Sequence, residues 1–334
     1  PAIDASYSTS MEHHAPIEPH AIIAQWRGND AVTIYEPSQW LLSGQRTYAE
    51  VLGLPVERVR LVSPYIGGAF GCKAFPWPHG LLCAAAAKQV GKPLKVVVSR
   101  RQMTANTGQR SPTEQRIRLS ATADGTLTAI DHEAKSHTSA VNVFTEPCTK
   151  ATPVMYATPN MRLYQELAVL NAGTPTFMRA PGETPGMWAL ESAMDELAWK
   201  LNVDPIALRL KNLAKDDQRK GLPFSEHHFA DCLKVGAERF GWQERPQPRS
   251  LSREGKQVGL GIAAATYPGL RGATSAKVRL LPNGTAHVLT AGNDMGTGSY
   301  TVVAMTASEA LGLPVEQIRV EMGDSRLPDG GIAG

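Results

Sequence analysis

The chain has 334 residues, of which 42% are hydrophobic and 19% are charged, and its formal net charge is +3. This length predicts two or three domains with a sizeable core, and the nearly balanced charge, without a run of five basic residues, argues against a nucleic-acid partner. No apolar run reaches the roughly 18–20 residues of a membrane span. Four scattered cysteines without CxxC spacing favour reduced thiols over a disulfide scaffold or an iron–sulfur site.

The first hundred residues predict mixed strands and helices. Residues 22–26 and 32–35 form a strand pair around a Gly-Asn-Asp turn, and a helix follows over about 39–51. The chain continues with a strand at 59–63 and a glycine-rich loop. A helix at 81–90 ends at Gly91, a residue type that favours the position after a helix, and a β-branched strand follows at 94–98.

The rest of the chain shows two hairpins and two helices. The hairpins turn at Asp124-Gly125 and Asn283-Gly284 between alternating segments. Residues 187–201 have the apolar spacing of an amphipathic helix, and Asp204-Pro205 is a helix start with Asp as the N-cap. Strands and helices do not alternate strictly, so the pattern favours an α+β fold over a doubly wound sheet.

One building block occurs twice, about 259 residues apart. Residues Leu52–Arg60 return as Leu311–Arg319 with seven of nine positions identical. Each copy predicts the end of a helix, a Gly-Leu-Pro turn and a strand that runs into a glycine-rich loop. Two copies at so long a period indicate two related lobes that face each other rather than a solenoid, with bare backbone amides able to approach an anion.

We expect the first lobe at residues 1–242, a polar linker at 243–256, and the incomplete start of the second lobe at 257–334. The second copy of the repeat stops inside its glycine loop, at Gly334, whereas a helix follows the loop in the first copy. We therefore expect the chain to be a fragment of a longer protein.

Several short patterns carry little functional information. The loop ending in Cys72-Lys73-Ala74 lacks the Gly and Ser/Thr that flank the lysine of a phosphate loop, and Gly259–Ala264 lacks the strand and helix of a dinucleotide site. Cys72 is interpreted as a small buried residue or as a reactive thiol. Surface histidines are favoured over metal ligands in two clusters: Glu12, His13, His14, Glu18, His20; and Glu226, His227, His228.

Arg179 is a stronger candidate. It stands between the apolar residues Phe177 and Met178 and the turn Pro181-Gly182, directly before a long helix. Because an unpaired guanidinium is costly to bury, it is expected to face a cavity or an anion. The alternative is an ion pair with Glu183.

Four motifs, which are spread over nearly the whole chain, occur in the same order as in a known protein family. They are Pro16–His20, Gly67–Lys73, Phe177–Glu183 and Asp294–Gly298. The chain resembles the molybdenum-cofactor-binding large subunit of the xanthine dehydrogenase/aldehyde oxidase family, and is most similar to the bacterial aldehyde oxidases. That family hydroxylates its substrates with oxygen from water.

The resemblance implies a set of site residues. The loop Gly68, Ala69, Phe70 and Gly71 would lie beside the molybdenum and its dithiolene, and Gln39 near an oxo ligand. The loop Gly296, Thr297 and Gly298 would touch the phosphate side of the cofactor, and Arg179 would line the substrate pocket. No side chain ligates the metal, since the pterin dithiolene holds molybdenum. The general base, a Glu in a late Gly-Glu motif, has no match in this chain.

The departures from the pattern also carry expectations. Ala69 and Cys72 replace glycines, and Thr297 replaces the usual Gln. Ala74 stands where purine-oxidising members have a Glu, so an aldehyde is favoured over xanthine. The chain is expected to be inactive alone, and the alternative is a cofactor-free fragment that acts only as a folded binding module.

The implied cofactors are molybdopterin, in its cytosine dinucleotide form, with molybdenum, and FAD and two-iron two-sulfur clusters on partner subunits. The implied partners are an iron–sulfur subunit and an FAD subunit. The implied compartment is the bacterial cytoplasm or periplasm.

Overall fold

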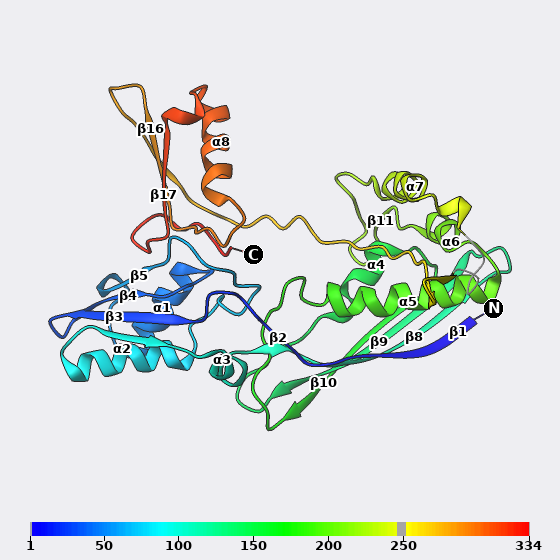
Figure 1. Ribbon diagram of the computed structural model, residues 1–334, viewed down its shortest axis with the longest axis horizontal. Coiled ribbons are helices and arrows are strands. Elements are labelled where there is room, and N and C mark those ends of the chain that lie inside the picture. Colours follow the sequence, from blue (N-terminus) through cyan, green and yellow to red (C-terminus); the bar gives the residue numbers. More distant parts are fainter. Residues whose placement is uncertain (1, 246–251, 334) are drawn as a thin grey trace. The chain divides into compact units, whose positions relative to one another are not determined.

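The computed structural model describes residues 2–245 and 252–333 (Figure 1). These residues form two compact units, each built from three stretches of chain. Unit 1 comprises Pro1–Met11, Ser111–Ala172 and Ala180–Pro268, and unit 2 comprises Glu12–Arg110, Gly173–Arg179 and Gly269–Gly334. The domain boundary expected at residues 243–256 stays a prediction. Residues 246–251 of this linker lie outside the described part. The mixture of sheets and helices confirms the α+β class.

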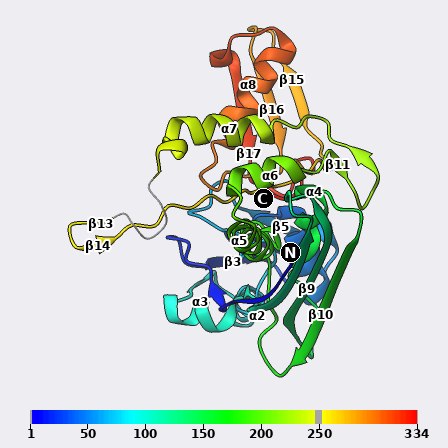
Figure 2. The same ribbon diagram turned by 90° about the vertical axis from the view of Figure 1, so that its right-hand side faces the viewer.

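Unit 1 is a four-stranded sheet with helices on one face (Figure 2). The strands, in spatial order, are β1 (Ala2–Thr9), β8 (Thr113–Ala121), β9 (Leu127–Ser139) and β10 (Met161–Leu170). The pairs β1–β8 and β8–β9 are antiparallel, the second as the Asp124-Gly125 hairpin predicts, whereas β9 and β10 are parallel. Helix α5 (Glu183–Leu201) packs its apolar side against the sheet, where Ile117, Leu119, Leu190, Met194 and Leu197 are buried.

Shorter elements complete unit 1. Helix α6 (Pro205–Asn212) begins at Asp204, whose Oδ1 accepts hydrogen bonds from the amides of Ile206 and Ala207, so the predicted cap is confirmed. The remaining helices and strands are α4 (Thr152–Met155), α7 (Phe229–Phe240), the 3-10 turns Cys148–Ala151 and Trp242–Glu244, β11 (Asp216–Asp217), β12 (Leu222–Pro223), β13 (Ser252–Arg253) and β14 (Lys256–Gln257).

Among the described residues, unit 2 contains a four-stranded sheet, a three-stranded sheet and a short two-stranded pair, and the first two share a hairpin–helix–strand connectivity. The larger has the order β5 (Val59–Val62), β4 (Ala31–Tyr35), β3 (Ala21–Arg27), β6 (Leu94–Val97), and α1 (Leu41–Leu52) and α2 (Pro78–Val90) pack against it. The smaller has β15 (Lys277–Leu280), β16 (Ala286–Thr290) and β17 (Ile318–Met322) with α8 (Ser299–Leu311). The unit also contains β2 (Glu12–His13), β7 (Gln109–Arg110), α3 (Arg100–Asn106) and the 3-10 turns Val56–Arg58 and Val315–Gln317.

The predicted repeat is confirmed as a hairpin–helix–strand unit that occurs twice within unit 2. In each copy the last strand, β5 or β17, pairs in parallel with the second strand of the hairpin. Each helix ends at a left-handed glycine, Gly53 with φ 64° and Gly312 with φ 65°, where a side chain would be strained. The copies contact each other: Arg60 of β5 forms an ion pair with Asp324, and the amide of Leu61 donates to Ser325 Oγ at 2.9 Å.

Candidate functional site

The candidate site is built around the first glycine loop, residues 66–73, which follows β5. Gly68 and Gly71 have φ of 90° and 108°, and Phe70 has φ 58°, a left-handed conformation that is unfavourable for a side-chain-bearing residue by roughly 1–2 kcal/mol. Such strain persists only where neighbours hold it. Here the carbonyl of Phe70 accepts a hydrogen bond from the amide of Arg179 at 2.9 Å.

The amides of this loop divide into used and unused groups. The amide of Gly67 donates to Glu18 Oε2 at 2.9 Å, and those of Gly71 and Lys73 donate to Gln39 Oε1 at 3.1 and 3.3 Å. Between them, the amides of Gly68, Ala69 and Phe70 donate to no acceptor in residues 2–245 or 252–333. Successive backbone amides without an internal acceptor, in a loop with left-handed residues, are groups that can bind an anion.

Gln39 lies between the two copies of the repeat. Its side chain is buried, and its Nε2 donates to the carbonyl of Ala333 at 2.7 Å while its Oε1 holds the first glycine loop. The resemblance implies an interaction of this side chain with an oxo ligand. In the structure the oxygen is fully engaged, so only the second hydrogen of Nε2 remains for a ligand.

A further glycine loop, Gly296–Gly298, lies directly before α8, and its amides contact the side chain of Asp294. Asp294 Oδ1 accepts hydrogen bonds from the amides of Gly296 and Gly298 at 2.7 and 3.3 Å. Burial alone would raise the pKa of Asp294, but these bonds and those from the amides at the start of α8 outweigh it and hold the pKa below its usual range. Two amides of the loop that was predicted to touch the phosphate side of the cofactor therefore donate to an internal carboxylate. Thr297, whose hydroxyl lies 3.0 Å from that of Ser299, presents the exposed polar groups.

The third element is the segment Phe177–Arg179, which is held at both ends by hydrogen bonds. The carbonyl of Phe177 lies 2.7 Å from His14 Nε2, and the carbonyl of Arg179 accepts a hydrogen bond from a guanidinium nitrogen of Arg110 at 2.6 Å. A Cβ at Gly71 would lie 2.1 Å from the Phe177 carbonyl oxygen, so only glycine permits this approach. The guanidinium of Arg179 is exposed in this chain, and Glu183 forms an ion pair with Lys150 at 2.8 Å.

Aromatic side chains flank the first glycine loop. The ring of Phe75 lies 6.5 Å from that of Trp40 and 6.1 Å from that of Phe177, measured between centroids. Phe70, Phe75 and Phe177 are each 40–44% exposed. Partly exposed aromatic side chains beside polar groups are the kind of residue that lines small-molecule sites.

The residues first considered as metal ligands have separate partners. Glu18 pairs with Lys73 and His20 Nε2 lies 3.3 Å from the carbonyl of Cys72, whereas Glu12 faces Arg110. His227 stacks on Phe224, and His228 faces Asp231 at 3.7 Å. In the part of the chain that the structure describes, no three His, Cys, Asp or Glu side chains converge on a position for a metal ion.

Cys72 is buried and its Sγ donates to the carbonyl of Ala69 at 3.0 Å. Burial raises the pKa of its thiol to about 11, which keeps it protonated at neutral pH. The interpretation as a small buried residue that fills the loop is therefore confirmed. All four cysteines are free.

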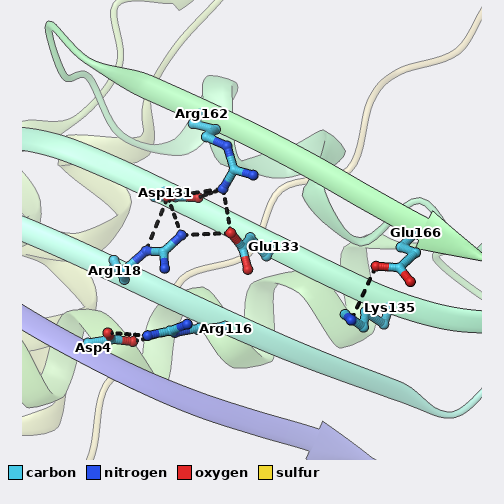
Figure 3. A network of polar contacts seen from close by, with 8 residues as sticks. All are labelled: Asp4, Arg116, Arg118, Asp131, Glu133, Lys135, Arg162 and Glu166. Carbon is cyan, nitrogen blue, oxygen red and sulfur yellow. Dashed lines mark hydrogen bonds and ion pairs between the residues drawn. The ribbon is translucent and has the colours of Figure 1, made fainter.

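A second polar cluster covers the sheet of unit 1 on the face that carries Arg116 (Figure 3). Its charges alternate in sign across the strands: Arg116 forms two hydrogen bonds with Asp4, and Arg118 contacts Asp131 and Glu133. Cross-strand pairs of this kind stabilise a sheet modestly. Because opposite charges already neutralise one another, this cluster shows the pattern of a solvated sheet surface rather than of a reaction centre.

Sequence reasoning missed three residues that shape the site: Glu18, Asp294 and Arg110. Glu18 and Asp294 lie inside the motifs that carry the resemblance, but no local pattern distinguishes a carboxylate that binds loop amides from one that faces solvent. Arg110 lies outside every motif, and its contact with Arg179 depends on segments 69 residues apart. No signal in the sequence identifies it.

The comparisons with known proteins agree with this geometry. Two family models of the molybdopterin cofactor-binding domain match, one over residues 2–213 and one over residues 235–334. The chain is 41% identical over 328 residues to the aldehyde oxidoreductase molybdenum-binding subunit PaoC of Escherichia coli O157:H7, covering 98% of this chain and 44% of that subunit.

Solved structures give the same result. The aldehyde oxidoreductase from Desulfovibrio gigas superposes with a TM-score of 0.85 at 26% identity, over all of this chain and 38% of the other. The one from Desulfovibrio desulfuricans has a TM-score of 0.88 at 25% identity. The chain thus spans less than half the length of these relatives. No helix among the residues that the structure places is long and apolar enough to cross a membrane.

Proposed function

Because the chain belongs to the molybdopterin cofactor-binding domain family, we propose that it forms part of the molybdenum-binding subunit of an enzyme that oxidises aldehydes to carboxylic acids. The observation that carries this proposal is the row of three unused amides at Gly68, Ala69 and Phe70, beside the segment that presents Arg179. It supports an anionic ligand at this loop, and both the phosphate and the oxo groups of a molybdopterin cofactor are anionic acceptors.

Unit 2 contains hydrogen-bond donors of the type that such a cofactor needs. The amides of Gly68, Ala69 and Phe70 would hold an oxo or sulfur-bearing edge, with Gly71 providing space, and the exposed Thr297 of the Gly296–Gly298 loop would contact the phosphate side. Gln39 would offer its remaining Nε2 hydrogen while it keeps the loop in place. When bound, the cofactor supplies a two-electron oxidation with oxygen taken from water.

The remaining roles follow from the chemistry of the side chains. Arg179 can orient the aldehyde by donating to its carbonyl oxygen and can stabilise the negative charge that develops there. Phe70, Phe75 and Phe177 would exclude water from the reacting carbon. The proton-accepting Glu that the resemblance implies is not assigned to any residue of this chain, so neither Glu183 nor Glu18 is given that role.

We further propose the cytosine dinucleotide form of the cofactor, and electron transfer to partner subunits that carry two-iron two-sulfur clusters and FAD. These assignments follow the resemblance, and the name of one relative, a molybdenum-binding subunit, supports an enzyme of several subunits. The compartment, bacterial cytoplasm or periplasm, stays a prediction.

The test compares substrates and metal content in the purified enzyme that contains this chain. We expect about one molybdenum per subunit by elemental mass spectrometry, turnover of benzaldehyde, and turnover of xanthine lower by roughly 10⁴, because the buried Ala74 has no carboxylate for purine recognition. Comparable rates on xanthine would contradict the aldehyde assignment. An enzyme without molybdenum would favour the cofactor-free binding module.

A further inference from the structure

We propose that Glu18 and Lys73 form a clasp that closes the first glycine loop and so sets the positions of the amides of Gly68, Ala69 and Phe70. Lys73 and Glu18 would then be positioning residues for the anion-binding part of the site. The effect of the clasp on cofactor binding rests on the proposed function. The clasp itself is a property of the loop that can be measured without a cofactor.

The geometry ties both ends of the loop to one carboxylate. Glu18 Oε2 accepts from the amide of Gly67 at 2.9 Å and from Lys73 Nζ at 2.8 Å. Lys73 Nζ also donates to the carbonyl of Glu18 at 2.9 Å, and the amide of Glu18 donates to the carbonyl of Gly67 at 3.0 Å. Gly67 and Lys73 stand on either side of the unused amides, so four hydrogen bonds fix the separation of the loop ends.

Glu18 is itself held in place. The guanidinium of Arg100 donates to the carbonyls of Pro16 and Ile17 at 2.6 and 3.2 Å, which fixes the segment that carries Glu18. A Cβ at Gly67 would lie 2.5 Å from the Cβ of Glu18, so the two backbones approach as closely as glycine allows. The clasp therefore joins the loop to an anchored segment rather than to a mobile side chain.

The ion pair between Lys73 and Glu18 is partly buried. The side chain of Lys73 is fully buried, and that of Glu18 is 39% exposed. Burial lowers the pKa of Lys73, and the hydrogen bond that its ammonium donates to Glu18 opposes that effect. A buried ammonium without its partner is strongly destabilising, whereas an apolar replacement of both groups is often neutral for stability. An apolar pair could therefore give the same stability. What the ion pair adds is a fixed distance between the two ends of the loop.

The test uses this 334-residue chain in three variants: Glu18→Leu, Lys73→Met and the double variant. Residue-resolved hydrogen exchange follows the amides of residues 66–73, and thermal unfolding follows overall stability. We expect both single variants to lower the melting temperature and to speed exchange at Gly67 about tenfold or more, since a hydrogen bond to a charged group is lost or weakened. The double variant should recover most of the melting temperature while exchange stays fast. Asp4→Asn, on the exposed sheet face of unit 1, is the control and should change neither loop exchange nor melting temperature appreciably.

A double variant with both wild-type stability and wild-type loop exchange would overturn the clasp, because the pair would then only neutralise buried charge. A second arm measures molybdenum content and kcat/KM in the complete enzyme carrying the double variant. We expect both to fall by about tenfold or more, and unchanged values alongside fast loop exchange would overturn the positioning role. If the wild-type enzyme holds no molybdenum, the proposed function fails, and the exchange measurement still decides the clasp.

Discussion

Gln39 and Ala333 exchange two hydrogen bonds although 294 residues separate them. Gln39 Nε2 donates to the carbonyl of Ala333 at 2.7 Å, and the amide of Ala333 donates to the backbone carbonyl of Gln39 at 2.8 Å. The side-chain oxygen of the same glutamine accepts from Gly71 and Lys73. One buried carboxamide therefore joins the glycine loop of the first repeat copy to the corresponding segment of the second.

Replacing Gln39 by Leu should destabilise the chain by about 2–4 kcal/mol, because the amides of Gly71 and Lys73 and the carbonyl of Ala333 lose their partner in a buried site. Urea unfolding of the chain measures the free energy of unfolding. Gln89→Ala, at an exposed position of α2, is the matched control and should stay within about 0.5 kcal/mol of the wild type. An equal loss in the two variants would show that the contacts of Gln39 are not what stabilises this region.

Glu36 should give the chain a pH-dependent stability. Burial raises the pKa of Glu36 to about 7, and the hydrogen bond from the Tyr48 hydroxyl at 2.6 Å only partly opposes this. The pKa in the folded state is above the unfolded value, so the stabilisation is complete below about pH 4.5 and is lost as the pH rises through 7. Glu36→Gln should therefore be more stable than the wild type at pH 8, by roughly 2–3 kcal/mol.

Urea unfolding at pH 5 and pH 8 measures this difference. The exposed Glu50→Gln of α1 serves as the control and should follow the wild-type profile. If wild type and Glu36→Gln show the same change between the two pH values, Glu36 is ionised throughout and the argument from burial is wrong.

Arg209→Met should destabilise unit 1 by about 3–5 kcal/mol, because it leaves Glu191 buried without its cation. Arg209 Nε donates to Glu191 Oε2 at 2.8 Å, and the same oxygen accepts from the amide of Ala264 at 2.6 Å. The double variant Glu191→Leu with Arg209→Met should regain most of the loss in a thermal or urea unfolding experiment. Arg162→Met, on the exposed sheet face, should cost less than about 1 kcal/mol. A double variant as unstable as the single one would mean that packing, not charge, sets the cost.

Arg179→Met in the enzyme that contains this chain should lower kcat/KM for an aldehyde by about 10²–10³, the usual effect of removing one donor that faces developing negative charge. Molybdenum content and melting temperature should remain close to wild type, since the variant keeps the backbone hydrogen bonds of residue 179 to Phe70 and Arg110. Arg58→Met, which removes an exposed ion pair with Asp30, is the control. Full activity in Arg179→Met would assign the arginine a structural role.

Local sequence patterns were sufficient where a structure depends on neighbouring residues. The hairpins at Asp124-Gly125 and Asn283-Gly284, the cap at Asp204, and the helix ends at Gly53 and Gly312 each need only one residue with the right backbone freedom or side-chain oxygen. The helix starts were less accurate: α2 begins at Pro78 and α5 at Glu183, earlier than the apolar spacing indicates, because the first turns of both helices contain Pro and Gly, which interrupt the apolar periodicity.

The sequence by itself determined the α+β class, the repeated helix–turn–strand segment and the family, because periodicity, turn residues and motifs are local properties. Only the tertiary structure decided the shape of the candidate site. Glu18, Gln39 and Arg179 reach the first glycine loop from separate segments, and the parallel pairing of β9 with β10 joins strands that no turn connects. Hydrogen bonds between distant segments depend on how the whole chain packs, and a local pattern contains no record of that packing.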